Sequence, residues 1–165
     1  MLKDMSEAYT IIRAIHLLAA ALWFGLVMVI NFVIQPVLIS LKGELRGQIV
    51  KSVFPRIFKL ASIFSATVVI TGLYMVYYLT NGNLEALLHG RWGISILIGS
   101  SLGILLTLFH FFLEEKLSKK IMLGKQGDNQ KLEEVHLKMK IVPRVGLTIL
   151  TIIFLLMINA AHGII

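Results

Sequence analysis

Four continuous apolar runs, at about residues 9–40, 54–80, 92–113 and 141–162, constrain this sequence more than any other feature. Each is longer than the roughly eighteen residues that mark a helix able to cross a bilayer. Together they take up most of the 165 residues and leave little chain for a soluble module. We therefore predict one all-α integral membrane domain over residues 1–165, an antiparallel four-helix bundle with helices at about 9–40, 54–80, 92–117 and 139–162.

The basic residues predict the orientation of this bundle. Thirteen of the sixteen Lys and Arg residues fall in or beside the first and third connections, and only Lys3, Arg13 and Arg91 lie on the other side. Positively charged connections face the cytoplasm. Both termini are therefore expected outside the cytoplasm, and the bundle is expected in the cell (inner) membrane. The net charge of +7 is then explained by the orientation of the bundle and by contacts of basic residues with anionic lipid headgroups, so nucleic acid is not expected as a partner.

The sequence contains no cysteine, which excludes disulfides, thiolate metal sites and covalently attached c-type haem. A metal or haem would have to be held by His, Met, Tyr, Lys or carboxylate. The polar third connection, with Gly124, Gly127 and Asp128 at its centre, indicates two cytoplasmic helix extensions joined by a turn. No paired carboxylates, Ser–His–Asp set or phosphate loop points to hydrolysis.

Ionisable residues inside membrane helices are costly and are functional candidates by default. His16 and Trp23 are seven residues apart, so they share a face of the first helix in its outer half. Arg13 lies one turn above His16, where interfacial anchoring is the competing interpretation. Pro36 is expected to kink the cytoplasmic end of this helix.

The last helix brings a second histidine to a similar depth. His162 follows Arg144 by eighteen residues, about 27 Å of helix, and therefore also reaches the outer leaflet or its edge. Two histidines on different helices could supply both axial ligands of a b-type haem. His89, in the outer connection, could replace His162, or the three together could bind copper or zinc.

The third helix carries Gly99, Gly103 and His110 on one face. A glycine-lined face could admit a flat porphyrin, but small residues at this spacing are more often a helix-packing motif. The same face could support a homo-oligomer. His110 lies too near the cytoplasmic end to share a metal with His16, so it is expected at a second site or in interhelical hydrogen bonding.

The segment IIRAIHLLAAALWFGLVMV resembles the first helix of copper-resistance D-like and protoporphyrinogen-oxidase HemJ-like membrane proteins, which carry a histidine followed two turns on by a tryptophan. His16 and Trp23 match that pair. The resemblance extends over most of the chain, through Thr71, Gly72 and Leu73, through Trp92 and His110, and through Arg144. It implies a small bundle that binds haem b or a porphyrin, or that handles copper.

The HemJ-like enzymes also have a lysine, implicated in haem ligation, about four residues after the tryptophan that opens the third helix. Ile96 stands at that position here. This departure counts against protoporphyrinogen oxidation and leaves the second axial position open to His162, His89 or His110.

Three classes of function follow. The first is a b-type cytochrome that exchanges electrons with a quinone or an external partner, which would make it a haem-dependent oxidoreductase. His16 and His162 would hold the haem beside Trp23. Arg13 or Arg91 would pair with the haem propionates. The second is copper handling, through His16, His89 and His162 with Met28, Met75 and Met157 as soft ligands deeper in the membrane. The third is an assembly subunit of a respiratory complex without a cofactor.

Overall fold

Helices make up nearly all of the computed structural model, which describes residues 2–41, 43–123 and 129–162. Helix α1 (Leu2–Val29) continues through a five-residue π-helix, η1 (Ile30–Ile34), into the short α2 (Gln35–Ser40). The long α3 (Gly43–Thr80), the 3₁₀ turn η2 (Leu84–Leu88), α4 (Gly90–Leu123) and α5 (Asn129–His162) follow. Within these ranges no residue is in a β-strand.

Four segments are long and apolar enough to cross a membrane, as the sequence predicted. They are Glu7–Ser40, Leu45–Thr80, Gly90–Phe112 and Ile141–His162. Many large apolar side chains on them face outward, among them Ile11, Leu18, Phe32 and Ile70, each at least 61% exposed. Such surfaces would be unstable in water but match the hydrocarbon of a bilayer. The all-α, four-span membrane architecture is confirmed.

The helices run farther than hydropathy alone predicts. α3 begins at Gly43 rather than near 54, and Pro55 is accommodated inside it. α4 continues to Leu123 and α5 begins at Asn129, so the two polar helix extensions are confirmed. Lys, Glu, Leu and Met all favour helix, and the helix therefore outlasts the apolar run. The predicted turn at 124–128 lies outside the described residues.

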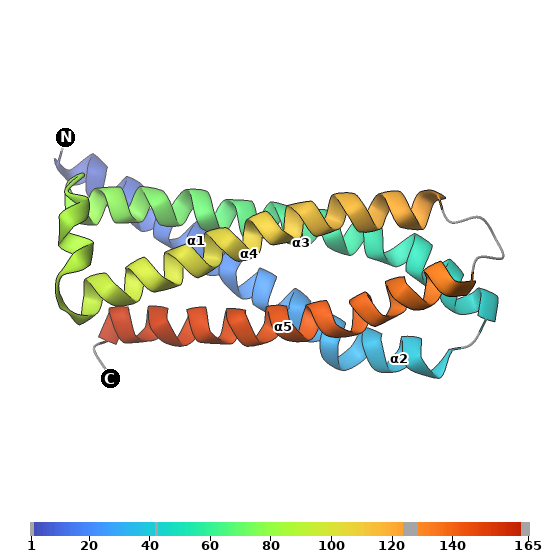
Figure 1. Ribbon diagram of the computed structural model, residues 1–165. Helices are drawn as coiled ribbons and strands as arrows, with labels where there is room; N and C mark the ends of the chain where they lie inside the picture. The colour runs from blue at the N-terminus through green and yellow to red at the C-terminus, as the bar shows by residue number, and fades with distance from the viewer. Residues whose placement is uncertain (1, 42, 124–128, 163–165) are drawn as a thin grey trace.

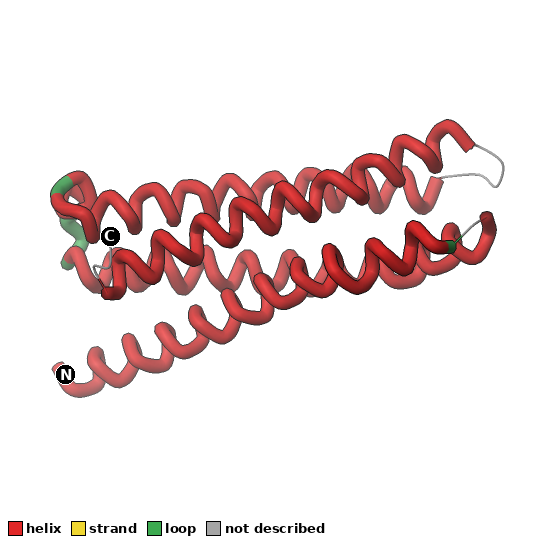
Figure 2. Tube along the Cα trace, turned by 90° about the horizontal axis from the view of Figure 1, so that it is seen from below, coloured by secondary structure: helices red, strands yellow, loops and turns green. Residues whose placement is uncertain are grey.

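Both ends of the chain lie at the same end of the bundle as η2, and the α2–α3 and α4–α5 connections lie at the other end (Figure 1). α1 crosses the bundle at an angle. At the end that holds the termini, α1 lies beside α3 and away from α5, and the second view shows the same separation (Figure 2). Toward the middle of the bundle α1 and α5 come together.

The core lies at this middle level. Trp23, Ala61 and Leu150 are buried together, with Phe24, Val27, Phe64, Val68, Leu106 and Ile153 packed around them. Ala61 and Ser65 are almost completely buried in α3, where small side chains let α1 approach closely. A second cluster of Leu38 and Phe54 closes the end near α2.

The π-helix η1 has a local cause in Pro36. Proline has no N–H to donate and its ring clashes with the preceding turn, so a regular α-helix is interrupted just before it. Asn31, inside η1, donates from Nδ2 to the carbonyls of Val27 at 2.8 Å and of Pro143 at 2.9 Å. The expected disturbance at Pro36 is therefore a π turn, held to α5 by an interhelical hydrogen bond.

Candidate functional site

His16 rests against α3 through two consecutive residues. Its Nδ1 lies 3.0 Å from Thr71 Oγ1. Beside it, a Cβ placed on Gly72 would lie 3.2 Å from His16 Cε1, closer than most side chains tolerate. A larger residue at 72 would therefore push the imidazole away from α3. Thr71 gives the imidazole a hydrogen-bonding partner, and Gly72 leaves room for the ring against α3.

The surroundings of Thr71 bear on which nitrogen of His16 carries the proton. Thr71 Oγ1 lies within hydrogen-bond distance of the backbone carbonyls of Thr67, at 2.5 Å, and Val68, at 3.2 Å. A hydroxyl that donates to one of these carbonyls accepts from the imidazole, which favours the tautomer with its proton on His16 Nδ1. In the neutral ring, Nε2 is left with a lone pair that can accept a hydrogen bond or bind a metal.

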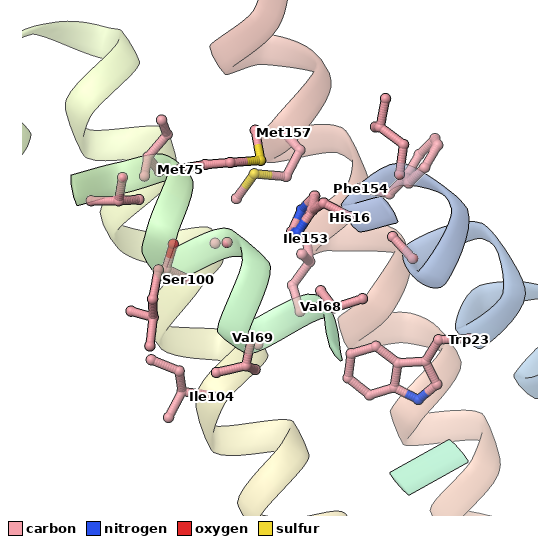
Figure 3. Close-up of a pocket in the computed structure, with 18 of the residues that line it drawn as sticks. His16, Trp23, Val68, Val69, Met75, Ser100, Ile104, Ile153, Phe154 and Met157 are labelled. Atoms are coloured by element: carbon pink, nitrogen blue, oxygen red, sulfur yellow. The ribbon is translucent and has the colours of Figure 1, made fainter. Parts of the chain in front are cut away.

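This imidazole borders a cavity of about 180 Å³ between the four membrane-crossing helices. Trp23 from α1, Val68 from α3, Ile104 from α4 and Ile153 from α5 line it, and its walls are almost entirely apolar (Figure 3). Trp23 is 4% exposed, so it contributes to the core and to the cavity wall at once. The cavity is partly open to the outside of the bundle.

Polar and soft groups enter this cavity from three helices besides α1. Ser100 from α4, Met75 from α3 and Met157 from α5 are among the lining residues, and Figure 3 shows the two methionine side chains approaching the same region as His16. Met28, the third methionine considered for copper, is partly exposed on α1 and is not among the lining residues.

The glycines of α4 have two different roles. A Cβ on Gly99 would collide with the end of the Met157 side chain, so this glycine serves helix packing. A Cβ on Gly103 would meet no atom within 4 Å, although Gly103 lines the cavity. Gly103 therefore leaves open space at the cavity wall, where a Cβ would not contact a neighbouring helix. Both glycines line the cavity, and of the two only Gly99 is in close contact with a neighbouring helix, so clearance for a porphyrin on this face stays a prediction.

His162 does not join His16. It is exposed, and it is not among the residues that line the cavity. It belongs to the same face of α5 as Thr148, Thr151 and Leu155, all exposed. That face points away from the bundle, whereas Ile153 and Met157 point toward the cavity. The expected convergence of the first and last helices on one iron through His16 and His162 is not present in this structure.

The remaining predicted site residues lie apart from the cavity. His89 is 76% exposed after η2, with Nε2 3.9 Å from a carboxylate oxygen of Glu85. Arg13 and Arg91 are exposed on α1 and α4. His110 Nε2 lies 3.4 Å from the carbonyl of Phe58, and its ring meets the Phe58 ring edge-on. His110 thus links α4 to α3, in keeping with the interhelical role that was one of the two expectations.

The cavity offers ligands for the iron of a b-type haem, but it is too small for the haem itself. His16 could bind iron with a thioether from Met75 or Met157, a His/Met pair known in cytochromes. A cavity of about 180 Å³ is, however, close to the ~150 Å³ that accepts benzene, and a tetrapyrrole is far larger. No Lys or Arg is among the lining residues to pair with propionates. A haem therefore does not fit unless the helices separate.

Metal clusters of the usual kind are also not formed. Over the described ranges, no three side chains of His, Cys, Asp or Glu come together as a metal site. The predicted cluster of His16, His89 and His162 is therefore not assembled.

A family model described as a domain of unknown function, DUF4149, matches residues 18–126. The chain belongs to the DUF4149 family. No curated protein and no solved structure matches it. The matched part of this DUF4149 chain includes Trp23, Thr71, Gly72 and Gly103. His16 precedes it by two residues, and Met157 follows it.

Two features of the DUF4149 site were missed from the sequence. One is Thr71 as the partner of His16, which lies 55 positions away in the chain. Its signal was present, since Thr71 and Gly72 are two adjacent small residues near the outer end of an otherwise bulky helix. The other is Ser100, which stands between Gly99 and Gly103 and lines the cavity, but which the sequence pattern did not single out.

Proposed function

We propose that this DUF4149 protein binds the ring of a lipid-soluble quinone or quinol in its intramembrane cavity, with His16 as the hydrogen-bonding group. The observation that carries the proposal is an imidazole, hydrogen-bonded to Thr71, at the wall of an apolar cavity. The quinone was expected from the sequence as a redox partner; here it becomes the ligand itself.

The size of the cavity supports a single ring. Its volume of about 180 Å³ is slightly above that of a cavity that binds benzene and below the ~300 Å³ at which pockets bury a whole drug-sized ligand. A substituted six-membered ring matches this space. The aromatic side chains of Trp23 and Phe154 on the wall suit such a ring.

The polar groups of the cavity match the chemistry of a quinol. A quinol hydroxyl donates a hydrogen bond, and His16 Nε2, unprotonated in the tautomer that Thr71 favours, accepts one. Ser100 contributes a hydroxyl from α4 on the other side of the cavity in Figure 3 and can serve the second ring oxygen. An imidazole with this tautomer can also take up the proton that an oxidised quinol releases.

Tryptophan fluorescence offers a direct test. The chain has two tryptophans, and in a Trp92→Phe variant only Trp23, on the cavity wall, remains. Quinones quench nearby tryptophan. We expect a benzoquinone headgroup to quench Trp23 saturably in detergent or nanodiscs, and His16→Phe to weaken this binding about tenfold, the loss of one hydrogen bond to a buried group. Quenching that rises linearly without saturation, equally in both proteins, would contradict the proposal.

A second candidate is a soft metal ion bound by His16 and a methionine thioether. Met75 and Met157 line the same cavity as His16, and thioether with imidazole suits Cu(I). Metal analysis of protein purified from copper-replete cells tests it. Stoichiometric copper that His16→Ala removes would favour this candidate over the quinone.

A further inference from the structure

Two residues that line the cavity, Leu17 on α1 and Phe154 on α5, are exposed on the side where these helices diverge. Phe24 and Phe154 stack across this interface with ring centroids 5.7 Å apart. Two turns farther toward the termini, the corresponding positions are Leu17 on α1 and Ala161 on α5, each seven residues from its phenylalanine and so on the same face. Figures 1 and 2 both show α1 and α5 separated at this end.

Neither Leu17 nor Ala161 is covered by another helix of the described chain. Leu17 lines the cavity and yet is 58% exposed, and Ala161 is exposed as well. Ala160 and Ala161 are both small, so α5 offers little bulk to meet Leu17. Phe154, also a lining residue, is 49% exposed beside the opening. Because these residues lie within membrane-crossing segments, the opening leads into lipid.

From this geometry we infer that the ligand carries a long apolar tail, which leaves the cavity between Leu17 and Ala161 and lies in the bilayer. This inference rests on the proposed function and names the ligand class within it: an isoprenoid or alkyl quinone rather than a free ring. The ring fills the available volume, so a substituent of any length has to pass through the opening. Leu17, Phe154 and the alanines offer the tail an apolar exit.

The opening also determines how the ligand enters. A tailed quinone is already dissolved in lipid, and lateral entry between two helices lets the tail stay there throughout. A route from the aqueous end would require the tail to leave the hydrocarbon, at roughly 0.8 kcal/mol for each CH₂ exposed. Leu17 and Ala161 are therefore predicted to control tailed ligands and to be indifferent to the bare ring.

Two quinones with the same headgroup test this inference. The dimethoxy-methyl-benzoquinone headgroup and its decyl-tailed form are titrated into the Trp92→Phe protein and its Ala161→Phe derivative, with Trp23 quenching as the readout. We expect Ala161→Phe to weaken the decyl form about tenfold while the bare headgroup changes by less than about twofold. Leu155→Trp, which adds bulk on an outward face of the same helix, is the matched control and should change neither.

A cross-linking experiment tests the same exit without relying on the fold of the Ala161→Phe variant. The chain has no cysteine, so Leu17→Cys and Ala161→Cys together give the only two thiols. Joining them with a short bifunctional maleimide after the decyl quinone has bound should trap it, and its release into empty vesicles should slow at least tenfold relative to the same double variant without the cross-link.

The outcomes separate the two proposals. Saturable binding of the bare headgroup, with decyl binding and release unaffected by Ala161→Phe and by the cross-link, would overturn the tail exit and leave the quinone site standing. Equal weakening of both forms in the folded variant would also overturn it. Absence of saturable binding by either form to the unaltered cavity would overturn the proposed function.

Discussion

His16 Nδ1 on α1 and Thr71 Oγ1 on α3 are joined by a 3.0 Å hydrogen bond. Thr71 Oγ1 also lies within hydrogen-bond distance of two carbonyls one turn back in its own helix, which favours the histidine as the donor. Thr71 thereby orients the imidazole that borders the cavity. This is the relationship that a metal-binding histidine has with its supporting residue, and it serves equally for a hydrogen-bonding histidine.

Thr71→Val should weaken binding of the headgroup without removing the cavity. Valine keeps the shape of threonine but cannot accept from His16 Nδ1, so the ring loses the partner that orients it. The loss of one hydrogen bond predicts a dissociation constant about three- to tenfold higher in the Trp23 quenching assay. Thr67→Val is the control, because Thr67 bonds only its own helix, at Ile63, and should leave binding unchanged. Equal effects of the two variants would contradict the role of Thr71.

Gly99→Ala and Gly103→Ala should differ in their effect on stability. A methyl group at 99 meets the terminal methyl of Met157, which can move aside because it is the far end of a flexible side chain, so the cost should lie near the lower end of the roughly 1–3 kcal/mol typical of overpacking. A methyl group at 103 meets nothing within 4 Å and should be tolerated. The midpoint of thermal unfolding in detergent is the measurement. Adding Met157→Ala to Gly99→Ala should recover most of the loss, and a Gly103→Ala protein as unstable as Gly99→Ala would contradict this assignment.

Any porphyrin iron that copurifies should depend on His16 and not on His162. His16 lines the cavity, whereas His162 is exposed on the opposite face of α5. A reduced-minus-oxidised spectrum is the measurement, with His16→Ala, His162→Ala and Met157→Leu as the variants. We expect His162→Ala to keep the full signal, and Met157→Leu to alter it because a thioether ligand raises the potential and changes the band position. Loss of the signal in His162→Ala would restore the bis-histidine hypothesis.

The distribution of basic residues predicts the orientation of the protein in the cell. His89→Cys should react with a membrane-impermeant maleimide on intact cells, since the η2 end carries few basic residues. Lys51→Cys, at the opposite end, should react only after permeabilisation. Both side chains are exposed, so access to the reagent decides the result. The reverse labelling pattern would invert the predicted topology.

The four spans could be predicted because bilayer thickness imposes a length that no soluble helix needs. The position of His16 and Trp23 on one face of α1 also followed from helix geometry, and both line the same cavity. The direction in which His162 points did not. In a membrane protein both the lipid-facing and the core-facing surfaces are apolar, so the sequence around His162 carries no strong contrast between the two sides of α5. The face of Thr148, Thr151 and His162 was identified correctly, but whether it looks inward depends on which helices pack beside α5.

The same limit explains why Thr71 and Ser100 were not assigned to the site. Hydroxyl residues in membrane helices usually bond their own backbone, as Thr67 and Thr151 do here. A threonine that also accepts from another helix looks no different in sequence. Only the packing of α1 on α3 separates Thr71 from the others.

The π turn η1 has a consequence for how α1 and α2 are compared with other chains. Twelve residues separate Trp23 from Gln35, which in an uninterrupted α-helix would place them about 120° apart. Both are nevertheless buried, at 4% and 5% exposure, because the wider turn absorbs about one residue of rotation. An alignment that treats residues 9–40 as one regular helix would therefore rotate every position beyond Asn31 by about 100° and would misplace the buried Gln35 and Leu38. Deleting one residue between 30 and 34 should be far better tolerated than deleting one between 16 and 23.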